Sequence, residues 1–475
     1  MGKHMRDTLT KTTREPREHL LSIRENGVLS WRTLGVVSLM GCIAIEVLFN
    51  LLPIDHNTVL LYWFFPASLL FFSQLYFHEG ITKHVEIKVF LAFLVWGVLT
   101  VVLNFRRLHM VESYWWFACM CASVFLCFSL PYAFDAKDTK RVLNLLAVVT
   151  LVVVTLLCVL SMIAIYAKDL AAKAPSIFEG IDIAGGRLAI DSHPNRSAPA
   201  PAMGVILAAY LFTAEKKVWR RVIFVIAALV CFVPLALTAS RTAILGTGLA
   251  LGYMAFLALK SALKGRVPQV LRYALCAVAA VAVLFAFYQG AEETVRLNNA
   301  ALEQAAAQTD PQAAEAVVER TFSDAESFNG RTGIWRGVWN GLTENPQILA
   351  YGTGPWMSSE VMAPYFPDGS PVGIFHNSLV GTLVAYGVVG LLLALLLLVL
   401  VAVAALRLSL GRHSHELAIR MLPAVLLFAV SEGMMEDFMF ANLSFNIVWI
   451  WFLIAAGFTF RLLKPDAIQE RSEEK

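Results

Sequence analysis

Three arginines stand where polar residues interrupt a largely apolar sequence. Arg187 follows two glycines, Arg241 separates the apolar runs PLALTAS and TAILGTGLALGY, and Arg331 begins RTGIWRGVWNGL. A guanidinium group binds two phosphate oxygens at once, so several such groups favour a multiply charged anion such as a pyrophosphate. Each arginine has an alternative interpretation as a solvated loop residue or a contact to a lipid headgroup. We predict that all three bind an anion.

Two histidines stand just before apolar runs. His376 and Asn377 precede a long uncharged run, and His193 and Asn195 precede another. The first backbone N–H groups of a helix lack partners, and the helix dipole favours an anion at that end. We therefore predict that His376 binds the anion or acts as a general base beside it. His193, Asn195 and Asn377 are predicted to bind the same anion, with simple helix capping as the alternative for His193 and Asn195.

Three carboxylates, Glu432, Glu436 and Asp437, are grouped at the end of another apolar run. Carboxylates at membrane depth are functional candidates by default, and these equally suit ion pairs with the arginines. Glu432 and Asp437 are therefore kept as candidate site residues. The sequence has no Asp-x-Asp triplet, and Asp324-Ala325-Glu326 is expected to be a solvated turn. We predict neither a metal nor a cofactor.

The composition is that of a membrane protein. Of 475 residues, 58% are apolar and 15% are charged, whereas a soluble protein is about a quarter charged. All seven cysteines fall in apolar runs without a CxxC pair, so we expect neither disulfides nor zinc. A helix needs about 20 apolar residues to cross a bilayer. The fold class predicted on this basis is an all-α polytopic membrane protein with about twelve transmembrane helices.

The predicted helices divide the chain into tails, membrane parts and one large loop. The transmembrane helices are expected near 33–53, 58–78, 85–105, 113–133, 142–167, 197–214, 219–238, 242–259, 272–289, 376–406, 419–436 and 441–462. The corresponding parts are a basic tail at 1–31, transmembrane helices 1–9 within 32–289, an outer helical loop at 290–375, transmembrane helices 10–12 within 376–462, and a second tail at 463–475.

The outer loop is predicted to be helical. AEETVRLNNAALEQAAAQ is rich in alanine, and TDPQAAEAVVERTF begins with Asp310-Pro311 as cap and first turn. GRTGIWRGVWNGL is amphipathic, and its apolar residues at helical spacing are Ile334, Trp335, Val338, Trp339 and Leu342. A loop of this length is usually functional when it is ordered.

The distribution of Lys and Arg orients the helices. Placing the N-terminus in the cytoplasm puts most of the 38 Lys and Arg residues on the cytoplasmic side, as the positive-inside rule requires. Both tails are then cytoplasmic, and the arginines and histidines singled out above lie on the outer side. A transporter is the rival interpretation, but transporters place polar residues near the bilayer midplane. Here Glu46 is the main charged residue within the spans, so we favour an enzyme.

Several short motifs resemble those of the O-antigen ligase and O-antigen polymerase family of bacterial envelope glycosyltransferases. They are Ser240-Arg241-Thr242 at the start of a span, Gly330-Arg331 followed by Trp335, Gly352-Thr353-Gly354, and His376-Asn377 followed by Gly387 and Gly390. Their order, with a large loop before the His-Asn helix, is similar to that of the family over about residues 30–465.

The resemblance implies a GT-C-like glycosyltransferase in the bacterial inner membrane, with a periplasmic active site. Such proteins take a glycan from undecaprenyl diphosphate and use neither a nucleotide sugar nor, as far as the family implies, a metal. The ligase branch transfers the glycan to lipid A-core and completes lipopolysaccharide, whereas the polymerase branch extends lipid-linked repeats. The extended helix after His376 and the helical loop favour a ligase over a polymerase.

The resemblance also implies functions in catalysis for four of the residues. An acceptor hydroxyl attacks the anomeric carbon with inversion, and the diphosphate leaves with increased charge. Arg187 and Arg241 are expected to stabilise that charge, with Arg331 assisting. His376 is expected either to accept the proton of the acceptor hydroxyl or to bind the phosphate.

Overall fold

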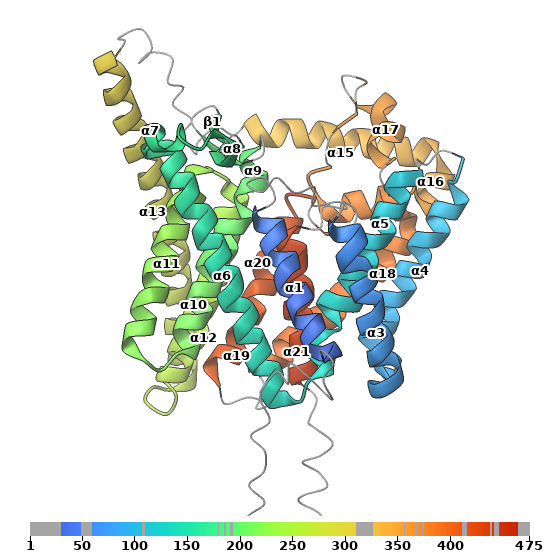
Figure 1. The fold of residues 1–475 in the computed structure, drawn as a ribbon, viewed down its shortest axis with the longest axis horizontal. Coiled ribbons are helices and arrows are strands. Elements are labelled where there is room, and N and C mark those ends of the chain that lie inside the picture. The colour runs from blue at the N-terminus through green and yellow to red at the C-terminus, as the bar shows by residue number, and fades with distance from the viewer. Residues whose placement is uncertain are drawn as a thin grey trace, which may run out of the picture.

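The helices form a bundle whose long members run roughly parallel, with shorter elements covering one end (Figure 1). The computed structural model describes residues 30–48, 59–106, 110–178, 180–184, 187–190, 193–309, 326–355, 357–366, 369, 371–372, 375–410, 416–437, 439–440 and 446–463.

The elements follow the apolar runs of the sequence. The first group comprises α1 (Trp31–Leu48), a π-helical turn (Leu60–Phe64), α3 (Phe65–Glu79), α4 (Val85–Leu103), α5 (Met110–Ala122), a π-helical segment (Ser123–Phe128) and α6 (Ala136–Tyr166). The second comprises α7 (Lys168–Ala171), α8 (Pro175–Phe178), β1 (Ile181–Ala184), β2 (Arg187–Ile190), α9 (Pro194–Ser197), α10 (Pro199–Ala214), α11 (Val218–Leu237), α12 (Arg241–Ala262) and α13 (Gln269–Thr309). The third comprises α15 (Glu326–Glu344), α16 (Pro346–Tyr351), α17 (Ser358–Met362), α18 (Ser378–Leu410), α19 (Leu417–Met421), α20 (Pro423–Gly433) and α21 (Ile447–Leu462).

Within the described residues, 8 helices are long and apolar enough to cross a membrane, which supports an all-α polytopic membrane protein. The other predicted spans coincide with shorter or interrupted helices, namely α3, α5, α19 with α20, and α21. Proline explains two of the interruptions. Pro66 and Pro423 stand at the starts of α3 and α20, where the missing N–H interrupts the regular α-helical hydrogen bonds to the preceding turn, although the backbone stays helical at Phe64 and Leu422. The count of twelve stays a prediction.

The outer segments differ in detail from the sequence-based expectation. β1 and β2 form an antiparallel hairpin with Ala184 opposite Arg187, a feature too short to be indicated by periodicity. α13 continues from the ninth predicted span to Thr309, so the first loop helix is not a separate element. The second loop helix, from Asp310 onward, and Asp324-Ala325 lie outside the described residues. The third is confirmed within α15.

α21 forms the centre of the bundle. Every residue from Ile447 to Thr459 is buried, so this helix is enclosed by protein. α13 is the opposite case, because only 6% of its membrane-spanning window is buried. The bundle is therefore asymmetric, with α13 at its edge.

α18 is interrupted at Gly387, whose φ of 65° and ψ of −170° are not helical. The interruption frees carbonyl groups one turn earlier, and other segments supply donors for them. Thr353 N–H donates to Val384 O (2.9 Å), and the Trp96 indole N–H donates to Tyr386 O (2.7 Å). Apolar surroundings demand such replacement partners. This contact anchors the Gly352-Thr353-Gly354 motif beside α18 and so fixes the helix that begins after His376.

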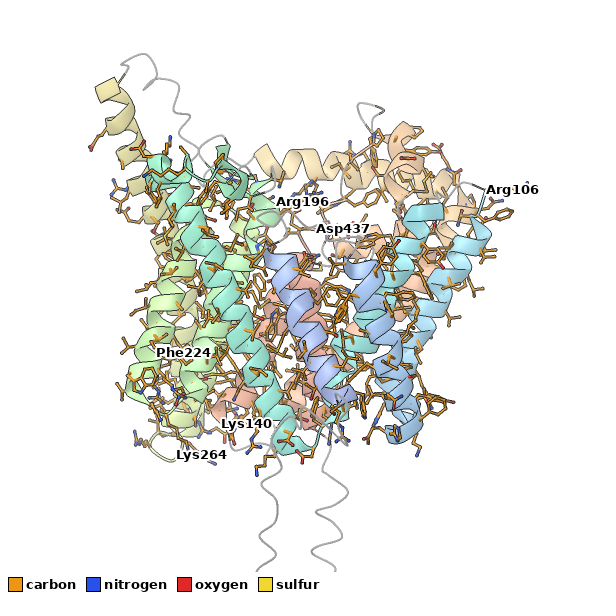
Figure 2. The ribbon with its side chains drawn as sticks, in the orientation of Figure 1. Arg106, Lys140, Arg196, Phe224, Lys264 and Asp437 are labelled. Carbon is orange, nitrogen blue, oxygen red and sulfur yellow. The ribbon has the colours of Figure 1, made fainter. Side chains whose placement is uncertain are left out.

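The two ends of the bundle carry different charged residues. Figure 2 shows Arg106, Arg196 and Asp437 at one end and Lys140 and Lys264 at the other. The positive-inside assignment predicts this separation. We call the first the site end and the second the far end; which compartment each faces stays a prediction.

Candidate active site

A buried carboxylate, Glu436, joins four segments at the site end. Its side chain is only 1% exposed. Oε1 accepts a hydrogen bond from Arg331 Nη2 (2.8 Å) and another from Asn195 Nδ2 (2.9 Å), and Oε2 lies 3.0 Å from His376 Nδ1. A buried carboxylate is stable only when its charge and lone pairs are matched in this way. The sequence places Glu436 in one group with Glu432 and Asp437 and contains nothing that distinguishes it from them.

α15 positions Arg331 beside the carboxylate of Glu436. Its apolar face packs as predicted, with Val338 and Leu342 buried, although Trp339 is 64% exposed and lies off that face. The Trp335 indole N–H donates to Phe375 O (2.9 Å), directly before His376. α15 lies across the site end (Figure 1), so this bond ties it to the start of α18.

His376 is held in an unusual backbone conformation. Its φ of 53° is in the left-handed region, which costs a non-glycine residue about 1–3 kcal/mol. Ala239 (φ 47°) and Phe440 (φ 58°) are the other non-glycine residues with positive φ in the described part of the chain, and both lie in turns next to site segments. Such strain is kept where surrounding contacts fix the conformation, and it is frequent at active sites.

Asn377 positions the histidine. Its Oδ1 accepts hydrogen bonds from Leu379 N (2.9 Å) and Val380 N (3.0 Å), which caps α18, and its Nδ2 donates to Met434 O (2.9 Å). The capping interaction accounts for an asparagine at this place. Contact between Asn377 and a substrate stays a prediction.

The contact with Glu436 determines which nitrogen of His376 is available. A carboxylate only accepts, so Nδ1 carries the hydrogen. In the neutral imidazole, Nε2 is then unprotonated and able to take a proton. The side chain is 23% exposed, so this nitrogen belongs to a residue that solvent or a substrate reaches. The arrangement is that of a general base oriented by a carboxylate.

Arg187 belongs to the same network through Asn195. Its Nη2 donates to Asn195 Oδ1 (2.7 Å), while the same amide donates to Glu436, and its Nε donates to Thr238 O (2.7 Å). The hairpin therefore places Arg187 beside the turn between α11 and α12. A continuous chain of polar contacts therefore links Arg187 through Asn195 to Glu436. Arg187 and Asn195, both predicted from the sequence to bind one anion, thus lie next to each other.

Arg241 follows this turn as the first residue of α12 and is half-buried. α12 and α20 pack closely, since a Cβ on Gly246 would lie 2.5 Å from Ser431 Oγ. Arg241 and Glu436 each lie about a turn and a half beyond that contact, toward the site end. Arg241 therefore lies at the same end of the bundle as the Glu436 network.

His193 acts as a cap. It is the N-cap of α9, and its Nδ1 accepts a hydrogen bond from Asn195 N (3.3 Å). Burial lowers the pKa of the His193 imidazole, with the nearby Glu436 opposing that effect. In the neutral form Nε2 carries the hydrogen, so His193 is a donor at this site. The capping alternative from the sequence is the observed one for His193, and its binding function stays a prediction.

Glu432 and Asp437 differ from Glu436. Glu432 is fully buried, and within the described residues neither of its carboxyl oxygens has a hydrogen-bond partner. Asp437 is also buried, and its Oδ1 likewise has none there. Burial, and secondarily the charge of Glu436, raises the pKa of Asp437 well above its usual value. Of the three carboxylates, Glu436 is therefore the one that pairs with an arginine.

One comparison with known protein families gives a match. Residues 226–395 match the model of the O-antigen ligase family, which confirms the resemblance over that region. The matched region includes Arg241, Arg331, His376 and Asn377. The match shows that this part of the chain is similar to the O-antigen ligase family. No curated protein matches the chain.

Proposed function

We propose that this protein is an O-antigen ligase of the bacterial inner membrane. It transfers a glycan from undecaprenyl diphosphate to lipid A-core oligosaccharide at the periplasmic face and so completes lipopolysaccharide. The observation that carries the proposal is the network around Glu436, in which a histidine with an available nitrogen lies beside arginines at one end of a membrane bundle. Acceptor activation and diphosphate binding are the two tasks that this reaction requires.

The reaction is a single displacement without a metal. The acceptor hydroxyl oxygen attacks the anomeric carbon, the bond from that carbon to the diphosphate oxygen breaks, and its electron pair stays on the diphosphate. The hydroxyl proton passes to His376 Nε2. Arg187, Arg241 and Arg331 bind the leaving diphosphate, where fixed positive charge lowers the barrier. Attack from the face opposite the leaving group inverts the anomeric configuration.

Glu436 favours the base function of His376 over phosphate binding. When Nε2 takes the proton, the imidazolium is formed 3.0 Å from a carboxylate, which stabilises it. The same carboxylate is the partner of Arg331 before substrate binds. A diphosphate then gives this arginine a second anionic partner.

An O-antigen polymerase is the alternative within the superfamily, because the family match does not separate the branches. A transporter is a more distant alternative, and the gathering of the polar network at one end of the bundle weighs against it.

The test is complementation of two hosts, one deficient in the ligase and one deficient in the polymerase. We expect the full-length protein to restore polymer-capped lipopolysaccharide in the first host only. Restoration in the polymerase-deficient host alone would establish the alternative branch. Failure in both, with the protein present in the membrane, would contradict the proposed donor and acceptor.

A further inference from the structure

A groove at the far end of the bundle lies between α6, α10 and α11, away from the Glu436 network. Its volume is about 510 Å³. Leu145 and Val148 form the wall on α6, and Ile223 and Phe224 form the facing wall on α11. Figure 2 places Phe224 in the same half of the bundle as Lys140 and Lys264. The groove is therefore an apolar site at the membrane boundary opposite the active site.

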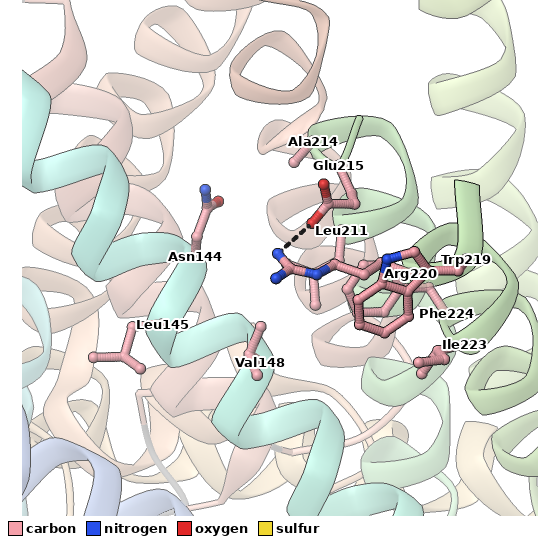
Figure 3. A pocket seen from close by; sticks show the side chains of 10 residues that line it. All are labelled: Asn144, Leu145, Val148, Leu211, Ala214, Glu215, Trp219, Arg220, Ile223 and Phe224. Carbon is pink, nitrogen blue, oxygen red and sulfur yellow. Dashed lines mark hydrogen bonds and ion pairs between the residues drawn. The ribbon is translucent and has the colours of Figure 1, made fainter. Parts of the chain in front are cut away.

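The mouth of the groove is polar. Figure 3 shows the Arg220 guanidinium extending from α11 toward Asn144 on α6, with Glu215 as its partner at 3.0 Å. The guanidinium carbon lies 5.2 Å from the centroid of the Trp219 ring. Trp219 is 59% exposed, as expected for an aromatic residue at a membrane–water interface.

Positive charge dominates this mouth. The connection EKKVWRR at 215–221 has four cationic side chains and one carboxylate. Glu215 accepts hydrogen bonds from the backbone of Lys216 (2.8 Å) and Lys217 (3.0 Å), while the side chains of both lysines are exposed. Backbone hydrogen bonding from Lys217, followed by that from the Arg220 side chain, lowers the pKa of Glu215 to about 2. Arg220 and Glu215 line the groove itself, and the two exposed lysines beside its mouth supply the surplus of positive charge.

Away from its polar mouth, the groove continues into exposed apolar surface of α6 and α11, which would face lipid. On α11, Val222, Ile226 and Leu229 are 51%, 55% and 60% exposed, and on α6 Val152 is 62% exposed. The groove thus has a cationic mouth at the boundary and an apolar path toward the hydrocarbon. A free phosphate or another small soluble anion would contact only the cationic mouth. A lipid with an anionic headgroup would contact the mouth with its headgroup and the apolar path with an acyl chain.

We propose that this groove binds one anionic glycerophospholipid of the leaflet at the far end. Its phosphate contacts Arg220 and the two lysines, Lys216 and Lys217, and one acyl chain lies between Val148 and Phe224. This site is separate from the donor and acceptor sites of the proposed transferase and does not depend on that function.

Native mass spectrometry of the purified full-length protein tests the proposal, with dioleoylphosphatidylglycerol and dioleoylphosphatidylcholine as the added lipids. We expect tighter retention of phosphatidylglycerol, and the double variant Lys217→Gln/Arg220→Gln should weaken it by about fivefold for each removed charge. The matched control is Lys264→Gln/Arg266→Gln, which removes the same residue types at the same end but outside the groove. Equal affinity for the two lipids, or equal loss in both double variants, would overturn the proposal.

A second pair of variants leaves the charges intact. Val148→Trp fills the apolar part of the groove, and Val95→Trp adds the same ring to the exposed surface of α4, away from the groove. Retention of phosphatidylglycerol should fall for Val148→Trp and stay unchanged for Val95→Trp. Unchanged retention in both would restrict the lipid to the charged surface and refute the groove. This pair decides the question if the charge variants do not fold.

Discussion

Replacing Glu436 by glutamine separates the two functions considered for His376. The side chain keeps its size, so the change acts on hydrogen bonding and charge. Arg331 and Asn195 both donate to Oε1, which requires the amide oxygen to stay on that side. The amide NH₂ then faces His376 Nδ1, at the position where Oε2 lay 3.0 Å away. Because an amide NH₂ only donates, Nδ1 must become the acceptor and the hydrogen moves to Nε2.

This change of tautomer removes the proton acceptor of the reaction. When a carboxylate that orients a catalytic histidine is replaced by an amide, the rate falls by about 10⁴ through the wrong tautomer alone. We expect a loss of that size in kcat for Glu436→Gln, with KM changed little. The assay is transfer from a synthetic lipid-linked glycan to purified lipid A-core by the detergent-purified protein, followed by gel mobility of the product.

Glu293→Gln is the matched control, because Glu293 pairs with Arg296 on the exposed part of α13. Its activity should equal that of the wild type, and both variants should keep the wild-type thermal unfolding midpoint within a few degrees. Near-normal kcat in a folded Glu436→Gln protein would refute the general-base assignment. A rise in KM with unchanged kcat would instead indicate that His376 binds the phosphate.

Four further outcomes are expected. His376→Ala should remain folded in membranes but abolish lipopolysaccharide capping in a ligase-deficient host; wild-type capping would refute its assignment. Arg241→Lys should lose about 10²–10³ in rate, since a point charge does not replace a two-pronged donor; normal activity would point to a lipid-headgroup contact. Activity should persist in excess EDTA, and a complete loss reversed by added cation would contradict the metal-free mechanism. Gly387→Ala should lower stability by at least about 1–3 kcal/mol, because its φ is 65° and a Cβ would lie 2.5 Å from Ala350 O; an unchanged midpoint in thermal unfolding would argue against the interrupted helix.

The sequence predicts much of the bundle because apolar length is a strong signal in lipid. The runs that became α6, α12 and α18 exceed the thickness of a bilayer, and no soluble structure explains them as well. The interruption of α18 at Gly387 is different. It depends on donors from residue 353 and from Trp96, which are distant in sequence, so a window of residues contains no sign of it.

The sequence predicts which arginines and histidines belong to the candidate site, but it does not predict that Glu436 connects them. Arginine on the outer side opposes the sorting rule for charges, and that contrast marks Arg187 and Arg331. His376 is marked by its place before the first turn of a long apolar helix. The choice among Glu432, Glu436 and Asp437 depends on which carboxylate the turn after α20 directs toward them. Side-chain direction in an irregular turn is set by tertiary contacts, here the bonds from Asn377 to Met434 O and from Ser378 to Glu436 O.

The charges of the site explain why a carboxylate lies among arginines that are proposed to bind an anion. Burial raises the pKa of Asp437, which favours its uncharged form. Among the four charged groups that the proposed site uses, the three arginines and Glu436, the formal charges leave a surplus of two positive charges. A diphosphate joined at both ends carries one negative charge on each phosphate, so the proposed donor balances this surplus. When the glycan departs, the diphosphate gains a further negative charge. At the same step His376 gains the proton of the acceptor, which supplies the matching positive charge beside Glu436. Without Glu436 the surplus would exceed the charge of the donor, and the site would bind the more highly charged product in preference to it.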